Sequence, residues 1–67
     1  MSIARVTEIS STSTTGFEDA IRQGIARAHK TLRGISGAWV KEQNVMINEG
    51  QIKEYRVNLL VTFLLDD

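Results

Sequence analysis

The sequence predicts an α+β fold with the plan βαββ, in which a three-stranded antiparallel sheet, in spatial order 1-3-2, wraps on one amphipathic helix. An alternating apolar stretch, Lys53 to Leu65, indicates a strand with one face to bury. Apolar residues spaced by three and four, from Phe17 to Leu32, indicate the helix. A turn at Asn48 to Gln51 indicates a hairpin. All 67 residues, 1–67, are assigned to one domain, because a chain of this length has room for a single core.

The first strand is expected to be a short edge strand from Ile3 to Ile9, because its alternation is imperfect. The hydroxyl-rich residues that follow it favour turns and helix starts over helix interiors. The helix is therefore expected to be capped by Ser13, or by Thr15 in a Thr-x-x-Glu box with Glu18.

The helix carries the clearest local pattern in the chain. Its apolar stripe consists of Phe17, Ala20, Ile21, Gly24, Ile25, Ala28 and Leu32. Glycine costs about 1 kcal/mol of helix propensity relative to alanine, so a close approach of the sheet is the compensation expected at Gly24. Gly34 then supplies a left-handed residue after the helix.

The second strand is expected from Ala38 to Ile47, with a bulge or bend near Gln43 and Asn44, where its apolar phase shifts. Gly50 provides the positive φ of the turn that leads into the third strand. As the most apolar strand, the third one is placed in the centre of the sheet, with the helix on one face.

The other face of the third strand begins polar and becomes apolar at Leu60 and Leu64. A solvated face would stay polar, so this end also needs a cover. One small chain has few elements with which to cover both faces. The pattern therefore predicts a partner subunit, and we expect a homo-oligomer.

Charge and composition exclude several classes of partner. Lys and Arg number 8 and Asp and Glu number 8, and this balance argues against nucleic acid as the main partner. The chain has no cysteine, so disulfides and thiolate metal sites are excluded, and oligomerisation remains as a way to stabilise so small a domain. We find neither a membrane span nor a signal peptide, and expect a cytoplasmic protein without a membrane partner.

No pattern indicates an enzyme. His29 is the only histidine and has no second metal-ligating or catalytic group nearby in sequence, and the carboxylates are scattered. No metal ligands can be named. Trp39 alternates with its apolar neighbours and so points to the opposite face, where an interface or core anchor is favoured over a platform for a planar ligand. For Arg56 a surface or intersubunit salt bridge is favoured over an anion-binding role.

Short motifs, in order and spaced over the whole chain, resemble those of the dodecins. The motifs are Thr12-Ser13, Ala26-Arg27-Ala28, Val40-Lys41-Glu42-Gln43, Tyr55-Arg56-Val57 and Val61-Thr62-Phe63. Dodecins are small βαββ proteins that assemble as hollow spheres of twelve subunits, and many members bind flavins. The resemblance implies a non-enzymatic dodecamer that acts as a binding, storage or buffering shell.

The resemblance also implies where a ligand would bind. Flavin-binding dodecins place a Trp at the start of the second strand, where copies paired across a symmetry axis sandwich the isoalloxazine ring; that position here is Gly37. They commonly hold the ring edge with a Gln on the third strand, and that position here is Arg56. Trp39 lies on the same face as Gly37, about 6.5–7 Å further along the strand, and would substitute imperfectly. The candidate cofactor-binding residues are Gly37, Trp39, Gln43 and Arg56.

The cofactor stays open between a weakly bound flavin and a calcium ion. The motif from Ala38 to Gln43, together with Tyr55-Arg56, looks more like the dodecin branch without the flavin Trp, some members of which are calcium-associated. With this position lost, we expect riboflavin and FMN to bind weakly or not at all. The alternative is a genuine riboflavin or FMN storage protein that uses Trp39 as its stacking platform.

Overall fold

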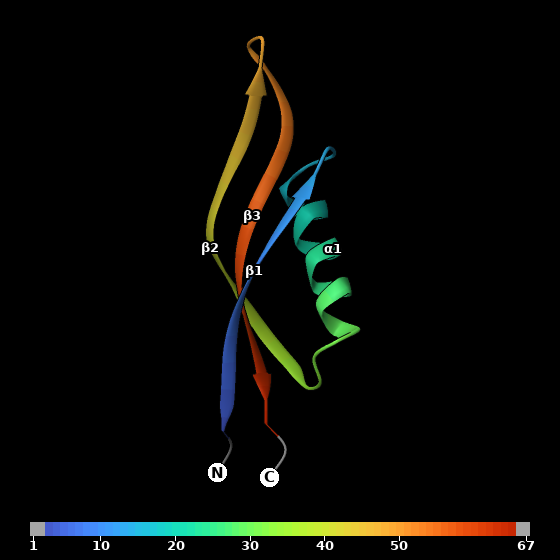
Figure 1. Cartoon of the computed structure of the whole chain (residues 1–67), viewed down its shortest axis with the longest axis vertical. Helices are drawn as coiled ribbons and strands as arrows, with labels where there is room; N and C mark the ends of the chain where they lie inside the picture. Colours follow the sequence, from blue (N-terminus) through green and yellow to red (C-terminus); the bar gives the residue numbers. More distant parts are fainter. Residues whose placement is uncertain (1–2, 66–67) are drawn as a thin grey trace.

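A computed structural model describes residues 3–65 of the chain. The order of elements is β1 (Ala4–Ser13), α1 (Phe17–His29), β2 (Ile35–Asn48) and β3 (Gln51–Leu64). β3 lies between β1 and β2 and is antiparallel to both, and α1 lies against the sheet beside β1 and β3 (Figure 1). The predicted βαββ plan and the strand order 1-3-2 are confirmed.

The core lies between α1 and the middle of β3. Val57, Leu59 and Val61 alternate along β3 and are at most 1% exposed, and Ala20 of α1 is fully buried against them. Around this cluster pack the half-buried side chains of Ile9, Phe17, Ile21, Ile25, Leu32 and Ile35. The helix therefore covers the continuously apolar face of the third strand, as its period of two predicts.

Gly24 allows α1 to approach the sheet closely. A methyl group at Gly24 would lie 3.1 Å from Cβ of Ser11 and 3.4 Å from Cδ1 of Leu59, and the first of these is a tight contact. The Ser11 hydroxyl also donates a hydrogen bond of 2.7 Å to the carbonyl oxygen of Ala20. The close approach expected at this glycine is confirmed.

The first strand is longer than predicted. β1 continues through Ser13, with Ser11 and Ser13 more buried than their neighbours Ser10 and Thr12. The prediction of a strand ending at Ile9 was wrong because serine was taken as a loop residue. Serine is also small, and small side chains on the helix side of a strand let a helix come close.

The start of α1 has no side-chain cap. Gly16 is the N-cap residue, and neither Ser13 nor Thr15 caps the helix with its side chain, so both predicted caps were wrong. The Ser13 hydroxyl instead donates to Oδ2 of Asp19 at 2.6 Å. It also accepts the backbone N–H groups of Thr15 and Gly16, at 2.9 and 3.4 Å. Ser13 thus closes the turn before the helix rather than the first turn of the helix.

Two glycines adopt the left-handed conformation expected of them. Gly34 has φ 69° after the helix, and Gly50 has φ 75° in the hairpin turn. Glu49 also has positive φ, at 52°, and Asn48 pairs with Gln51 across the turn. Two successive left-handed residues make a two-residue turn whose twist matches that of the flanking strands.

β2 is irregular along its length. Its register against β3 shifts between Ile35 and Gly37, between Val40 and Glu42, and between Met46 and Ile47. The shift predicted near Gln43 and Asn44 lies earlier, at Lys41. Lys41 is an extra residue opposite β3, and residues after it point to the face opposite to the one expected from simple alternation.

The molecule is elongated. The hairpin of β2 and β3 extends beyond α1 (Figure 1), and the chain measures 51 × 19 × 13 Å. Its radius of gyration is 13.8 Å, whereas a compact domain of this length is expected to have about 10.9 Å. No helix within residues 3–65 is long and apolar enough to cross a membrane.

Candidate functional site

The sheet face turned away from α1 carries three of the four predicted site residues. Gly37 pairs with Thr62, Trp39 with Leu60, and Asn44 with Arg56. Residues that pair directly across antiparallel strands point to the same face, and the even-numbered residues of β3 point away from the buried odd-numbered ones. Gly37, Trp39 and Arg56 therefore share the face away from the helix, which we call the outer face.

Gln43 does not join this group. It pairs with Val57 of the core cluster and so lies on the helix side of β2, where it is exposed. In a regular strand Trp39 and Gln43, four residues apart, would share a face. The extra residue at Lys41 reverses this relation, so one copy of the chain does not bring Gln43 to the outer face.

Trp39 is the most prominent apolar group of the outer face. Its side chain lies beside Leu60 of β3 and is 61% exposed. Lys41 Nζ reaches Glu8 Oε1 at 3.2 Å and so links β2 to β1 over the central strand. A large exposed aromatic side chain in such a setting is typical of an interface or of a ligand platform.

Gly37 leaves open space next to Trp39. A Cβ atom at this position would have no heavy atom within 4 Å, and the φ angle of Gly37 is not in the left-handed region. A larger side chain can therefore be placed at this position without a clash and without backbone strain. The outer face therefore has space for a second aromatic ring at position 37, where this sequence has glycine.

Arg56 lies further along the outer face, in a row with Thr12 and Asn44. It is half-buried, and within residues 3–65 of one chain it forms no ion pair. In the next row, Asn58 donates a hydrogen bond of 2.9 Å to Oε1 of Glu42. The backbone positions of Arg56 and Leu60, the neighbour of Trp39, are about 13 Å apart along β3. Within one chain, Arg56 and Trp39 thus lie in different rows of the outer face.

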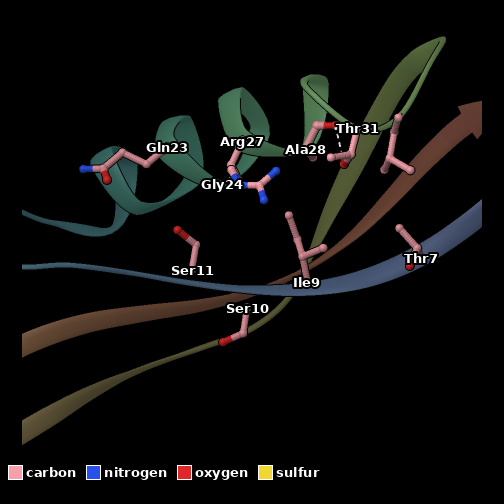
Figure 2. Close-up of a pocket in the computed structure, with 10 residues that line it drawn as sticks. Thr7, Ile9, Ser10, Ser11, Gln23, Gly24, Arg27, Ala28 and Thr31 are labelled. Atoms are coloured by element: carbon pink, nitrogen blue, oxygen red, sulfur yellow. Dashed lines mark hydrogen bonds between the residues drawn. The ribbon is translucent and has the colours of Figure 1, made fainter.

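A second polar region was missed by the sequence analysis. A groove between α1 and β1 is lined by Thr7, Ile9, Ser10, Ser11, Gln23, Gly24, Arg27, Ala28, Thr31 and Leu32. Figure 2 shows Arg27 extending from α1 toward β1, while Ser10 points away from the helix. None of the four predicted residues lines this groove. The available signal was the spacing of Gly24 and Arg27, which places them one helical turn apart on one side of α1.

The carboxylates do not gather into a metal site within one chain. Among residues 3–65, no three His, Cys, Asp or Glu side chains are placed to hold a metal ion together. Two carboxylates of the outer face are already engaged, Glu8 by Lys41 and Glu42 by Asn58. In the part of the chain that the structure describes, the outer face of a single copy therefore offers apolar and hydrogen-bonding surface rather than a cation site.

Comparison with known proteins gives one consistent family. The dodecin family model matches residues 3–66. The dodecin of Thermus thermophilus is 45% identical over 60 residues, which cover 90% of this chain and 87% of the relative. The solved dodecin from Streptomyces davaonensis has a TM-score of 0.93 at 41% identity, with 98% of this chain and 97% of that chain covered.

A more distant solved relative is described by its calcium. The calcium dodecin from Mycobacterium tuberculosis, called a calcium-chelating antigen with a novel calcium-binding site, has a TM-score of 0.82 at 32% identity. The match covers 96% of this chain and 91% of that chain. The TM-score and the sequence identity are both lower than for the Streptomyces dodecin. The expected closeness to a calcium-associated branch therefore stays a prediction.

Proposed function

The chain belongs to the dodecin family, and we propose that it forms a non-enzymatic homo-oligomeric shell of twelve copies that serves in binding, storage or buffering in the cytoplasm. The outer face supports this proposal, since it exposes Trp39 beside Leu60, and a second copy can cover both. No catalytic constellation was found in the sequence, and the site residues described above include no nucleophile with a partnered base.

We propose further that the shell binds riboflavin or FMN weakly or not at all. The observation that carries this proposal is the open space at Gly37, where flavin-binding relatives are expected to place their stacking Trp. An aromatic stack contributes about 0.5–1.5 kcal/mol beyond the area that it buries, and two symmetry-related copies would each lose one.

The alternative function is flavin storage with Trp39 as the platform. Its support is that the indole is 61% exposed on the same face as Gly37 and two residues away. A calcium-associated shell is a further variant of the first proposal. Within residues 3–65 a single copy has no three His, Cys, Asp or Glu side chains placed to hold a metal ion together, and carboxylates of neighbouring copies would supply further oxygen ligands for calcium.

The first prediction concerns flavin affinity. In a fluorescence titration with riboflavin, the unmodified protein should quench weakly, whereas Gly37→Trp should bind tighter by about 5- to 150-fold, which is the factor for two regained stacks. Gly37→Leu is the matched control. It adds apolar bulk without an aromatic ring, so its riboflavin affinity should rise much less.

Two outcomes would return the chain to the flavin-storing alternative. One is a yellow purified protein with a flavin absorption spectrum, and the other is submicromolar riboflavin affinity without any substitution. Trp39→Ala then distinguishes the roles of the indole. Loss of stability points to an interface anchor, whereas loss of affinity alone points to a stacking platform.

A further inference from the structure

Helix α1 leaves the helix side of β2 uncovered. Along β2 only Ile35 and Val45 are even half-buried, and Val40, which pairs with the core residue Leu59, is 46% exposed. Between α1 and the start of β2 lies a largely apolar groove, lined by Ile21, Arg22, Ile25, Ala26, His29 and Ile35. We call it the α1/β2 groove.

The end of the β2–β3 hairpin has the opposite shape. It projects beyond α1 (Figure 1), and three of its apolar side chains are exposed, with Met46 at 42%, Ile47 at 65% and Ile52 at 52%. We call residues 46–54 the hairpin tip. An apolar projection and an apolar groove in the same chain are complementary surfaces, but the tip points away from the groove of its own copy.

The total exposed surface is larger than that of a compact monomer of the same mass. The chain exposes 5092 Å², whereas a compact monomer of 7.5 kDa is expected to expose about 4250 Å². The excess of about 840 Å² is close to the roughly 800 Å² that one partner contributes to a standard interface. The exposed apolar side chains of the hairpin tip and Val40 on the helix side of β2 contribute to this excess.

The charges also match. The hairpin tip carries Glu49 and Glu54 against the single cation Lys53, whereas the residues that line the α1/β2 groove include the cation Arg22 and no carboxylate. The Arg22 side chain pairs with Glu18 on the surface yet stays 76% exposed. An acidic tip approaching this groove meets the Arg22 guanidinium at its rim, which favours one orientation of docking.

We propose that the hairpin tip of one copy docks in the α1/β2 groove of a second copy. This inference rests on the proposed homo-oligomer and specifies one of its contacts. The α1/β1 groove fits the tip less well, because Thr7, Ser11, Gln23 and Arg27 would lose water against apolar side chains. Each copy has one tip and one groove on different elements, so the contact is head-to-tail and is completed by closing a ring.

The test uses the absence of cysteine from the sequence. Two single-cysteine chains, Ile47→Cys and Ala26→Cys, carry different tags, are assembled together and are treated with a short bifunctional maleimide. Both positions are exposed in one copy. We expect a mixed cross-linked pair as the main product on a denaturing gel. Each chain carries one cysteine, so this product joins two copies.

The matched control replaces Ala26→Cys by Thr12→Cys, which is exposed on the outer face and should cross-link to Ile47→Cys at least ten-fold less. Predominant Ile47–Ile47 pairs would overturn the inference, because they indicate tip-to-tip contact. An oligomer of normal mass without the mixed product would overturn it too, but would leave the proposed shell standing. A mass of 7.5 kDa for the unmodified protein would overturn both. Should Ile47→Cys alone disturb assembly, Gln51→Cys at the same tip takes its place.

Discussion

At the scale of single residues, one hydroxyl group holds the turn between β1 and α1. Ser13 is 6% exposed, and its oxygen donates to Asp19 and accepts two backbone N–H groups. Asp19 in turn accepts a hydrogen bond from Gln23. This chain of bonds connects the end of a strand to the first two turns of the helix, so its loss is expected to loosen both.

The second prediction therefore concerns Ser13→Ala. It should lower the free energy of unfolding by about 1–3 kcal/mol, because the three hydrogen bonds of a buried hydroxyl are lost. Urea denaturation at fixed protein concentration measures this change. Thr15→Ala is the control and should stay within about 0.5 kcal/mol, because the Thr15 side chain forms no cap. Equal effects of the two substitutions would show that the assigned hydrogen bonds are wrong.

The face on which Trp39 lies could be predicted from the sequence, and that of Gln43 could not. Alternation around Ala38 and Val40 is regular, so Trp39 was correctly placed away from the core face. Gln43 follows the extra residue Lys41, and a bulge of one residue exchanges the two faces of every later position. No residue type marks a bulge at Lys41, since lysine occurs as readily in a regular edge strand.

At the scale of elements, the hydrophobic periods were sufficient to predict α1 and β3 but not the full length of β1. The helix stripe and the alternation of β3 follow from burial on one side, and both were found in the structure. The second half of β1 buries serine instead of valine, because α1 approaches it at Gly24. Small polar residues beneath a closely packed helix look like loop residues in a sequence. The predicted strand therefore ended at Ile9 instead of Ser13.

The third prediction concerns the hairpin turn. Gly50→Ala should lower the free energy of unfolding by about 1–2 kcal/mol, because φ of 75° places a Cβ atom against the following carbonyl. Gly37→Ala is the matched control. It also adds one methyl group in open space but at an ordinary φ, so it should be neutral or slightly stabilising. Thermal unfolding at one protein concentration compares the two. A Gly50→Ala protein as stable as Gly37→Ala would contradict the left-handed turn.

At the scale of the whole molecule, one copy has a small core and many exposed apolar side chains. Only five apolar residues of the described chain are buried, namely Ala20, Ala28, Val57, Leu59 and Val61. The outer face and the hairpin tip together expose Trp39, Met46, Ile47 and Ile52, while Leu64 is 44% exposed at the other end of β3. A domain with so small a core gains stability most readily by burying these groups against further copies.

The fourth prediction tests this assembly on the outer face. Light scattering should report a mass many times 7.5 kDa, and Leu60→Asp or Leu64→Asp should dissociate or unfold the protein. Burying an unpaired carboxylate costs several kcal/mol. Thr12→Asp is the control, because it places the same charge on the same face in the row of Arg56. If the protein remains a dodecamer with aspartate at either leucine, the outer face is not an interface between copies.

The sheet topology also determines when the chain can fold. Within residues 3–65, β1 and β2 each hydrogen-bond to β3 and not to each other, and β3 is the last strand to be synthesised. Until β3 leaves the ribosome, neither of the earlier strands has a partner, and a 13-residue helix is marginal on its own. Pairs such as Ala4 with Leu64 span nearly the whole described chain, and such distant contacts slow folding. We therefore expect the sheet and the core to form together, once β3 has been synthesised.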